Sequence, residues 1–145
     1  MKPIPFGRYL LLDRLAIGGM AEVYVAALRD DRAGRLFALK RMLPTLAEDE
    51  EFVAMFLDEA RLVAQLSHPG LVAIHDLGKQ GDAYYIANEY VPGQDVRALL
   101  ERTRRTGERI PVPLAAYVAF RVADALDYAH RKRDAQGREL RVVHR

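Results

Sequence analysis

Residues 1–90 contain short apolar runs separated by polar, turn-forming residues. Runs of this length, bounded by Gly, Pro, Asp or Asn, predict β-strands. The runs cover residues 9–15, 23–28, 35–42, 71–77 and 83–90. Because short turns join most of them, we expect an antiparallel meander of five strands.

Between the third and fourth runs, the apolar residues recur at intervals of three and four. This spacing places them on one face of an amphipathic helix over about residues 48–67. Proline cannot continue the helical hydrogen bonds, so His68-Pro69-Gly70 is expected to end this helix. The apolar residues on this face are Phe52, Met55, Phe56, Val63 and Leu66.

Beyond residue 91 the pattern becomes helical. Asp95 is suited to cap a helix over residues 96–105, and Pro113 suits the first turn of a longer helix to about residue 131. A turn at 134–137 and a short strand at 140–143 are expected to follow. Strands enclosing one helix, then helices alone, predict an α+β fold.

The composition is that of an ordinary globular domain, with 50% hydrophobic and 29% charged residues in a chain of 145. The absence of cysteine excludes disulfides and thiol chemistry. No secretory signal and no apolar run of about 20 residues is present. We therefore expect a cytoplasmic segment without membrane contact, even if a longer parent protein carries an anchor further along.

The net charge is only +2, so we expect no nucleic-acid partner. The basic residues nevertheless cluster, at 131–133 and in a second group. Such runs either bind phosphate-rich partners or form solvated helix ends that the helix dipole favours, and we favour the second interpretation. The second group is Arg102, Arg104, Arg105 and Arg109.

The turn between the first two strands contains adjacent glycines. Phosphate-binding loops use glycine because a side chain would keep backbone N–H groups away from the anion. A Gly-Gly hairpin turn is also common in sheets, so the turn alone leaves both interpretations open. The candidate binding residues here are Leu15, Ala16, Ile17, Gly18, Gly19, Met20, Ala21 and Val23.

Strand alternation puts Ala38 and Lys40 on one face and Phe37 and Leu39 on the other. A small residue beside a cation suits a nucleotide pocket, with adenine on Ala38 and phosphate at Lys40. Lysine is rare among the basic residues of this chain, which favours a compact point charge at this position. The alternative is an edge-strand lysine that deters aggregation.

Glu59 lies three residues after Phe56 and four before Val63, within the apolar stripe of its helix. A carboxylate on a buried face is costly unless it is paired. An ion pair between Lys40 and Glu59 accounts for both residues. The alternative is that Glu59 flanks the stripe and extends into solvent.

In their order and spacing, these features resemble the ATP-binding half of a eukaryotic-like (Hanks-type) bacterial Ser/Thr protein kinase. Residues 16–23 align with Gly-x-Gly-x-x-Gly-x-Val, although only the central Gly18 is retained and the outer positions are Ala16 and Ala21. Residues 37–40 match the strand that carries the family's lysine, and residues 124–130 match the helix before the catalytic loop.

The resemblance implies a protein-kinase-like fold. Residues 1–8 would be an N-terminal extension, and residues 9–145 an incomplete kinase domain. Within it, 9–90 would form the smaller lobe, with five antiparallel strands and one helix. Residues 91–95 would form the hinge, and 96–145 the first helices of the larger lobe.

The resemblance also implies the chemistry, which is transfer of the ATP γ-phosphate to Ser/Thr hydroxyls of a protein substrate, with Mg²⁺. Lys40, held by Glu59, would orient the phosphates. The backbones of Glu89 and Val91 would bind adenine, and Asn88 would occupy the gatekeeper position. Asp95 is equally suited to the ribose hydroxyls and to a helix cap.

The sequence stops at His144-Arg145, one residue before the aspartate that the resemblance predicts. We therefore expect the chain as given to lack the catalytic Asp and the Mg²⁺ ligands, and to be inactive alone. Because of Ala16 and Ala21, a pseudokinase or nucleotide-binding scaffold is the first alternative. An unrelated α+β interaction domain is the second. The histidines show no metal-ligand spacing, and no Gly-x-Ser-x-Gly elbow is present.

Overall fold

The computed structural model describes residues 2–140 and 142. It divides into two compact units, each described by itself below. The first comprises Met1–Ser67 and Val72–Tyr90, and the second comprises His68–Leu71 and Val91–Arg145. The expected residues His144 and Arg145, and most of the expected strand at 140–143, lie outside the described residues.

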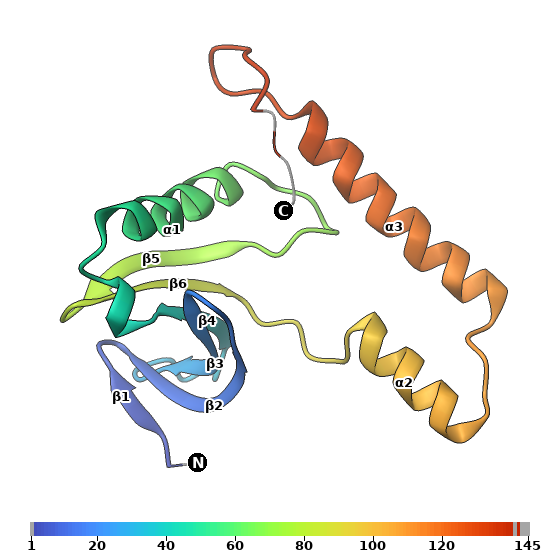
Figure 1. The fold of residues 1–145 in the computed structure, drawn as a ribbon, viewed down its shortest axis with the longest axis horizontal. Coiled ribbons are helices and arrows are strands. Elements are labelled where there is room, and N and C mark those ends of the chain that lie inside the picture. The colour runs from blue at the N-terminus through green and yellow to red at the C-terminus, as the bar shows by residue number, and fades with distance from the viewer. Residues whose placement is uncertain (1, 141, 143–145) are drawn as a thin grey trace. The chain divides into compact units, whose positions relative to one another are not determined.

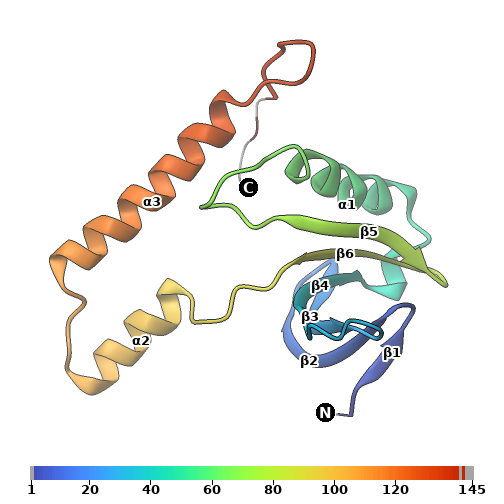
Figure 2. The ribbon, with the colours of Figure 1, turned by 180° about the vertical axis from the view of Figure 1, so that it is seen from behind.

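The described part of the first unit is a curled antiparallel sheet with a helix alongside it (Figures 1 and 2). The strand order is β1-β2-β3-β4-β6-β5. A 3₁₀ turn, Pro44–Leu46, precedes helix α1, Glu50–Val63. The strands are β1 Ile4–Phe6, β2 Tyr9–Ile17, β3 Ala21–Leu28, β4 Leu36–Met42, β5 Ile74–Gln80 and β6 Ala83–Glu89. The five expected strands are all present.

The first strand, β1, was not expected. It pairs with β2 through Ile4↔Leu11 and Phe6↔Tyr9, so the sheet has six strands rather than the five predicted. Phe6 is buried, and its ring meets the ring of Tyr85 edge-on at 5.5 Å. Residues 1–8 are therefore partly built into the sheet and are not only an extension.

Apolar side chains pack on both faces of the sheet, because alternate residues of each strand point to opposite sides. The cluster on the α1 side joins strand residues to Phe56 and Ala60 of the helix. Its strand members are Ala21, Met42 and Ile86. The cluster on the other side consists of Phe6, Tyr9, Leu11, Tyr24, Ala26, Phe37, Leu39 and Ala87.

Helix α1 is shorter than the predicted helix over residues 48–67. Asp49 caps its N-terminus, and the Asp49 carboxylate accepts hydrogen bonds from the backbone N–H groups of Glu51 and Phe52. The helix ends at Val63, before His68-Pro69-Gly70. The backbone N–H groups of Gln65 and Leu66 donate to carbonyls three residues earlier, which is the pattern of a 3₁₀ turn and not of an α-helix. Leu66 therefore lies outside the helical face to which its spacing assigned it.

One carboxylate ties together three distant parts of the first unit. Asp76 Oδ2 accepts hydrogen bonds from the hydroxyls of Tyr9 (2.9 Å) and Tyr85 (2.8 Å), and it pairs with Arg8 at 2.7 Å. Burial alone raises the pKa of Asp76, but these hydrogen bonds and the Arg8 ion pair together hold that pKa below its usual value. Burial and the bond to Asp76 raise the pKa of Tyr85 to about 12.

We expect Asp76→Asn to lower the free energy of unfolding by about 2–4 kcal/mol at neutral pH, since two hydrogen bonds lose their charged acceptor. The folded-state pKa of Asp76 is depressed, so its stabilisation is present above the unfolded-state pKa and is lost as pH falls through the folded value. Urea unfolding at several pH values should therefore show the two proteins converging in acid. Asp82→Asn, in the exposed β5–β6 turn, is the control. An equal gap at every pH would contradict the prediction.

The described part of the second unit contains two helices, α2 Val96–Thr106 and α3 Val112–Arg131. Pro113 lies in the first turn of α3, as expected. His68 Nε2 lies 3.3 Å from Asp124 Oδ2 of α3, and the His68 ring stacks on Tyr128. The predicted turn at 134–137 is present, with Gly137 N–H donating to the Asp134 carbonyl.

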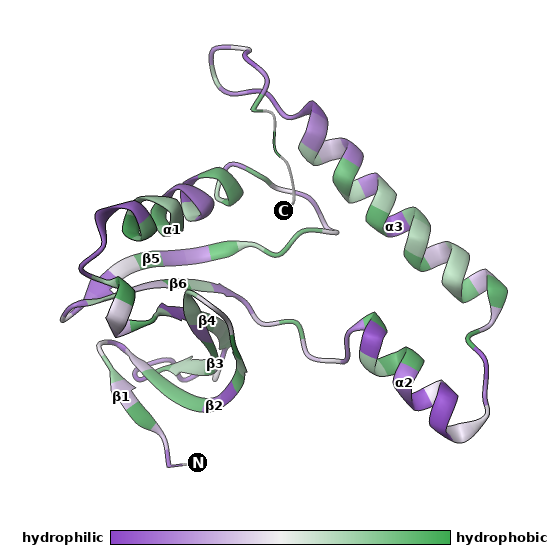
Figure 3. Ribbon diagram, viewed as in Figure 1, coloured by the Kyte–Doolittle hydropathy of each residue, from purple (hydrophilic) through white to green (hydrophobic). Residues whose placement is uncertain are grey.

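Helix α3 has hydrophobic positions along its whole length (Figure 3). Several of its large apolar side chains are more than half exposed, among them Phe120 at 64%. No helix of the described residues is long and apolar enough to cross a membrane.

Candidate functional site

The expected ion pair between Lys40 and Glu59 is present. Lys40 Nζ, on β4, donates to both carboxylate oxygens of Glu59, on α1, at 2.8 and 2.7 Å. The ammonium also lies 5.5 Å from the centre of the Phe56 ring. Helix α1 thus holds the Lys40 ammonium at a defined point beside the sheet.

Glu59 is not buried, which corrects the expectation that it lies within the apolar stripe. Its side chain is 48% exposed, whereas Phe56 and Ala60 are almost completely covered. The row of α1 that contacts the sheet runs through these two residues, and Glu59 lies beside that row. Met55, also expected on the buried face, is 45% exposed for the same reason. The pair is therefore hydrated, and its Coulomb energy is modest.

The register places the other predicted strand residues next to Lys40. Lys40 pairs with Val23 of β3, and Ala38 pairs with Asn88 of β6. Directly paired residues of antiparallel strands present their side chains on the same face. Lys40 also pairs with Ile86, which packs against α1, so these residues share the α1 side of the sheet.

The glycine turn connects β2 to β3. Gly18 N–H donates to the Ala21 carbonyl at 2.8 Å and closes the turn. A Cβ on Gly19 would have no atom within 4 Å, and one on Gly18 would make only an ordinary contact at 3.6 Å. Neither glycine has the positive φ that would require its presence. The fold therefore does not explain these two glycines.

The remaining residues of this loop differ in burial. Leu15 and Ile17 are 50% and 61% exposed, and Ala16 is also exposed. Met20 is half-buried, and its carbonyl accepts a hydrogen bond from Leu43 N–H. Ala21 is buried against the α1-side core. The methyl group of Ala21, unlike that of Ala16, thus has a packing role.

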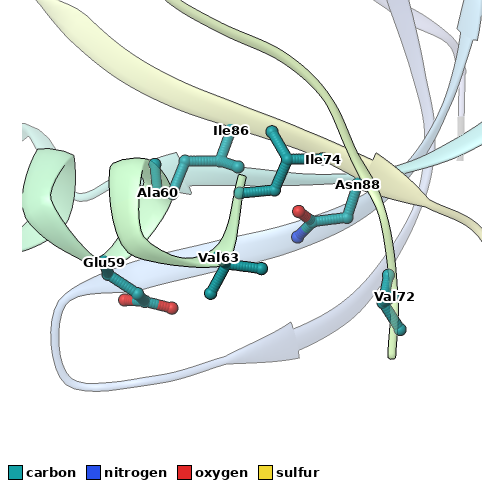
Figure 4. Close-up of a pocket in the computed structure, with 7 residues that line it drawn as sticks. All are labelled: Glu59, Ala60, Val63, Val72, Ile74, Ile86 and Asn88. Carbon is teal, nitrogen blue, oxygen red and sulfur yellow. The ribbon is translucent and has the colours of Figure 1, made fainter. Parts of the chain in front are cut away.

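A pocket with an empty volume of about 350 Å³, including space open to solvent, lies beside the ion pair. Figure 4 shows its lining coming from α1 on one side and from β5, β6 and the segment before β5 on the other. Two polar side chains, Glu59 and Asn88, interrupt an otherwise apolar wall. The apolar lining is Ala60, Val63, Val72, Ile74 and Ile86.

The residues predicted to bind adenine and ribose fall in both units, whereas the predicted hinge, 91–95, belongs to the second. Glu89 ends β6, where its N–H donates to the Ala73 carbonyl at 2.8 Å. Val91 and Asp95 belong to the second unit, and Val91 is 62% exposed. Asp95 caps α2, because its Oδ1 accepts from Ala98 N–H at 2.7 Å. Of the two roles suggested for Asp95, the structure therefore contains the helix cap.

Sequence reasoning missed an ionic cluster that joins β2, β3 and β4. Glu22 accepts from Arg41 at 2.6 Å, from the Tyr24 hydroxyl at 2.9 Å and from Arg14 at 3.1 Å. The Arg41 hydrogen bond, opposed by a smaller effect of burial, holds the pKa of Glu22 below its ordinary value. The Glu22–Arg41 pair becomes predictable once the strand register is known, because these two residues lie directly opposite each other on β3 and β4.

The described residues contain no group of three or more His, Cys, Asp or Glu side chains arranged to hold a metal ion. The protein kinase domain model matches residues 9–145. The chain belongs to the protein kinase family.

Similar kinases come from several bacteria. The chain is 42% identical over 142 residues to the tyrosine-protein kinase MasK of Myxococcus xanthus, covering 97% of this chain and 22% of that one. It is 41% identical to a probable serine/threonine-protein kinase, PknB, of Bifidobacterium longum, covering 86% and 19%. It is 35% identical to the serine/threonine-protein kinase PknA of Mycobacterium tuberculosis, covering 86% and 30%. The chain thus spans less than a third of the length of these relatives.

The solved structures agree with this assignment of the fold. The kinase domain of PknI from Mycobacterium tuberculosis matches with a TM-score of 0.67 and 32% sequence identity, covering 90% of this chain and 51% of that domain. The chain therefore has a protein-kinase-like α+β fold and spans about half of that kinase domain.

Proposed function

We propose that this chain is the ATP-binding part of a serine/threonine protein kinase that transfers the γ-phosphate of ATP to protein hydroxyls in the cytoplasm. The Lys40–Glu59 pair is the observation that supports this most strongly. A cation fixed on a strand by a helix carboxylate is suited to orient the α- and β-phosphates. In this proposal Lys40 contacts ATP, and Glu59 positions Lys40.

The other predicted residues would form the walls of the adenine and ribose sites. Val23 and Ala38 lie on the Lys40 side of the sheet and are suited to pack on adenine, with Leu15 and Ile17 of the exposed loop above it. Asn88 limits the space behind adenine. The backbones of Glu89 and Val91 would bind its polar edge, and Asp95 the ribose through the carboxylate oxygen that does not cap α2.

The described residues hold no cluster that fits Mg²⁺. We propose that the Mg²⁺ ligands and the catalytic aspartate belong to residues that are not in this chain, so the 145-residue chain alone should be inactive. When bound, the metal would neutralise charge on the phosphates.

The direct test is transfer of labelled phosphate from ATP by the full-length protein, followed by identification of the labelled amino acid. Label on Ser or Thr supports the proposal. Label on Tyr would favour the second candidate, a tyrosine kinase, which the name of the Myxococcus xanthus relative suggests. ATP binding without transfer would indicate a pseudokinase, consistent with alanine at positions 16 and 21. Absence of both would overturn the proposal.

We expect Gly18→Ala to weaken ATP binding by at least about tenfold without destabilising the fold. The new methyl group meets only the Ala21 carbonyl, at 3.6 Å, but it would hold phosphate away from backbone donors, and one charged hydrogen bond contributes about 1.5–3 kcal/mol. Calorimetric titration of the full-length protein with ATP measures the affinity, and thermal unfolding is the control. Unchanged affinity would mean that this glycine serves the turn alone.

A further inference from the structure

Helix α2 and the loop that follows it carry an excess of positive charge. Residues 96–111 contain five arginines and two glutamates, a net charge of +3 in a chain whose total is +2. All five arginines are exposed, and none has an acidic partner among the described residues. We call these residues the α2 arginine surface, which consists of Arg97, Arg102, Arg104, Arg105 and Arg109.

Many other arginines of this chain do find acids. Arg35, Arg131 and Arg138 each pair with an acid four residues away, at 2.7–2.8 Å. On α2, Glu101 lies four residues from both Arg97 and Arg105, but within the described residues no ion pair joins it to either. Within the described residues, no acid therefore competes with an external ligand for the α2 guanidinium groups.

Stabilisation of the helix end does not explain this surface. Arg104 and Arg105 lie in the last turn of α2, where the helix dipole favours cations. Arg97, however, lies in the first turn, where a positive charge is unfavourable. Arg97 and Arg104 are seven residues apart, so they share one face across two turns. Positive charge is thus present from the first turn of the helix to the last, with Glu101 as the one acid on the same side.

We propose that the α2 arginine surface binds an acidic segment of the protein substrate. This inference rests on the proposed function, because it identifies the class of protein that the kinase phosphorylates. Guanidinium groups match carboxylates with paired hydrogen bonds, and the surface contains arginine without lysine. Asp95, a proposed nucleotide-binding residue, caps the same helix. A docked acidic segment would therefore lie on the helix that Asp95 caps.

An anionic membrane surface is the competing occupant. The remaining side of α2 presents Val96, Leu99 and Leu100, which are 42–50% exposed. It contains no aromatic residue, whereas helices that lie in membrane interfaces are rich in Trp and Phe beside their basic face. The composition of α2 thus favours an acidic protein segment.

Binding of labelled peptides to the full-length protein tests the proposal without requiring catalysis. Two peptides share one Ser/Thr phosphoacceptor, flanked either by glutamates or by glutamines, and fluorescence anisotropy measures their affinity at low salt. We expect the glutamate peptide to bind at least about tenfold more tightly, and added salt to remove the difference.

Two variants identify the surface. Arg104→Glu with Arg105→Glu should abolish the preference for the glutamate peptide. The control, Arg29→Glu with Arg32→Glu, makes the same charge change at two exposed arginines of the β3–β4 turn, which have no acidic partner in the described structure. This control should retain the preference for the glutamate peptide. If charge reversal disturbs α2, as circular dichroism would reveal, the neutral pair Arg104→Gln and Arg105→Gln replaces it.

Three results would overturn the inference. They are equal affinity for both peptides in the wild type, retention of the preference in the α2 variants, and arginine-dependent binding to phosphatidylserine vesicles without a peptide preference. The proposed function fails separately, if the wild type shows the peptide preference but phosphorylates neither peptide. If both hold, the α2 variants should raise KM for the glutamate peptide and leave kcat on the glutamine peptide unchanged.

Discussion

Replacing Lys40 with methionine is expected to lower kcat for phosphoryl transfer in the full-length protein by about 10²–10³-fold, the usual effect of removing one preorganised charge from the reacting group. The substitution keeps the length and apolar stem of the side chain, so its contacts with the Phe56 ring persist in part. Glu59 loses its partner but is 48% exposed, and water replaces the lost hydrogen bonds. The cost in stability should therefore be below about 1 kcal/mol.

The contrast between activity and stability makes this experiment decisive. Lys79→Met is the matched control, because Lys79 Nζ also lies over an aromatic ring, that of Tyr84 at 4.8 Å, but on β5 and away from the ion pair. We expect the control to retain full activity. A Lys40→Met protein within a few-fold of the wild type would remove Lys40 from the proposed site.

Strand alternation, helix spacing and the kinase resemblance together led to the predicted Lys40–Glu59 pair, which the structure contains. Alternation put Lys40 on the face opposite Phe37 and Leu39, and these two residues are indeed buried on the other side of the sheet. Such periodic signals are local and survive in a single sequence. The functional roles assigned to the pair stay predictions until activity is measured.

The exposure of Glu59 was predicted wrongly for a geometric reason. Spacing gives the angle of each residue around a helix but not the width of the strip that the sheet covers. In α1 that strip is narrow, and only Phe56 and Ala60 are fully buried. The ion pair thus forms at the edge of the helix contact and not inside it.

Long-range features were not predictable. Strand β1 has three residues, one of them proline, and shows no alternation that would mark it as a strand. Strand β1 is stabilised by its pairing with β2 and by the contact of the Phe6 ring with the Tyr85 ring. Asp76 likewise gathers donors from positions 8, 9 and 85, and only the curled sheet brings these together. Sequence periodicity carries no information about such contacts.

The largest effect on stability is expected from Phe56→Ala. Phe56 is completely buried and is the main large side chain by which α1 contacts Met42 and Ile86 of the sheet. Removing a buried phenylalanine side chain costs about 3–5 kcal/mol, a large part of the roughly 5–15 kcal/mol that holds a domain folded. Loss of this anchor would also release Glu59, one turn away, from Lys40.

Met55→Ala is the matched control, because Met55 precedes Phe56 on the same helix but is 45% exposed. We expect it to lower the free energy of unfolding by less than about 1 kcal/mol, as surface substitutions usually do. Urea unfolding of both variants measures the difference, and ATP titration of the folded fraction measures the effect on the site. If Phe56→Ala costs no more than Met55→Ala, α1 is held by contacts other than Phe56. If Phe56→Ala destabilises the fold but leaves ATP affinity unchanged, the position of α1 does not control the Lys40 site.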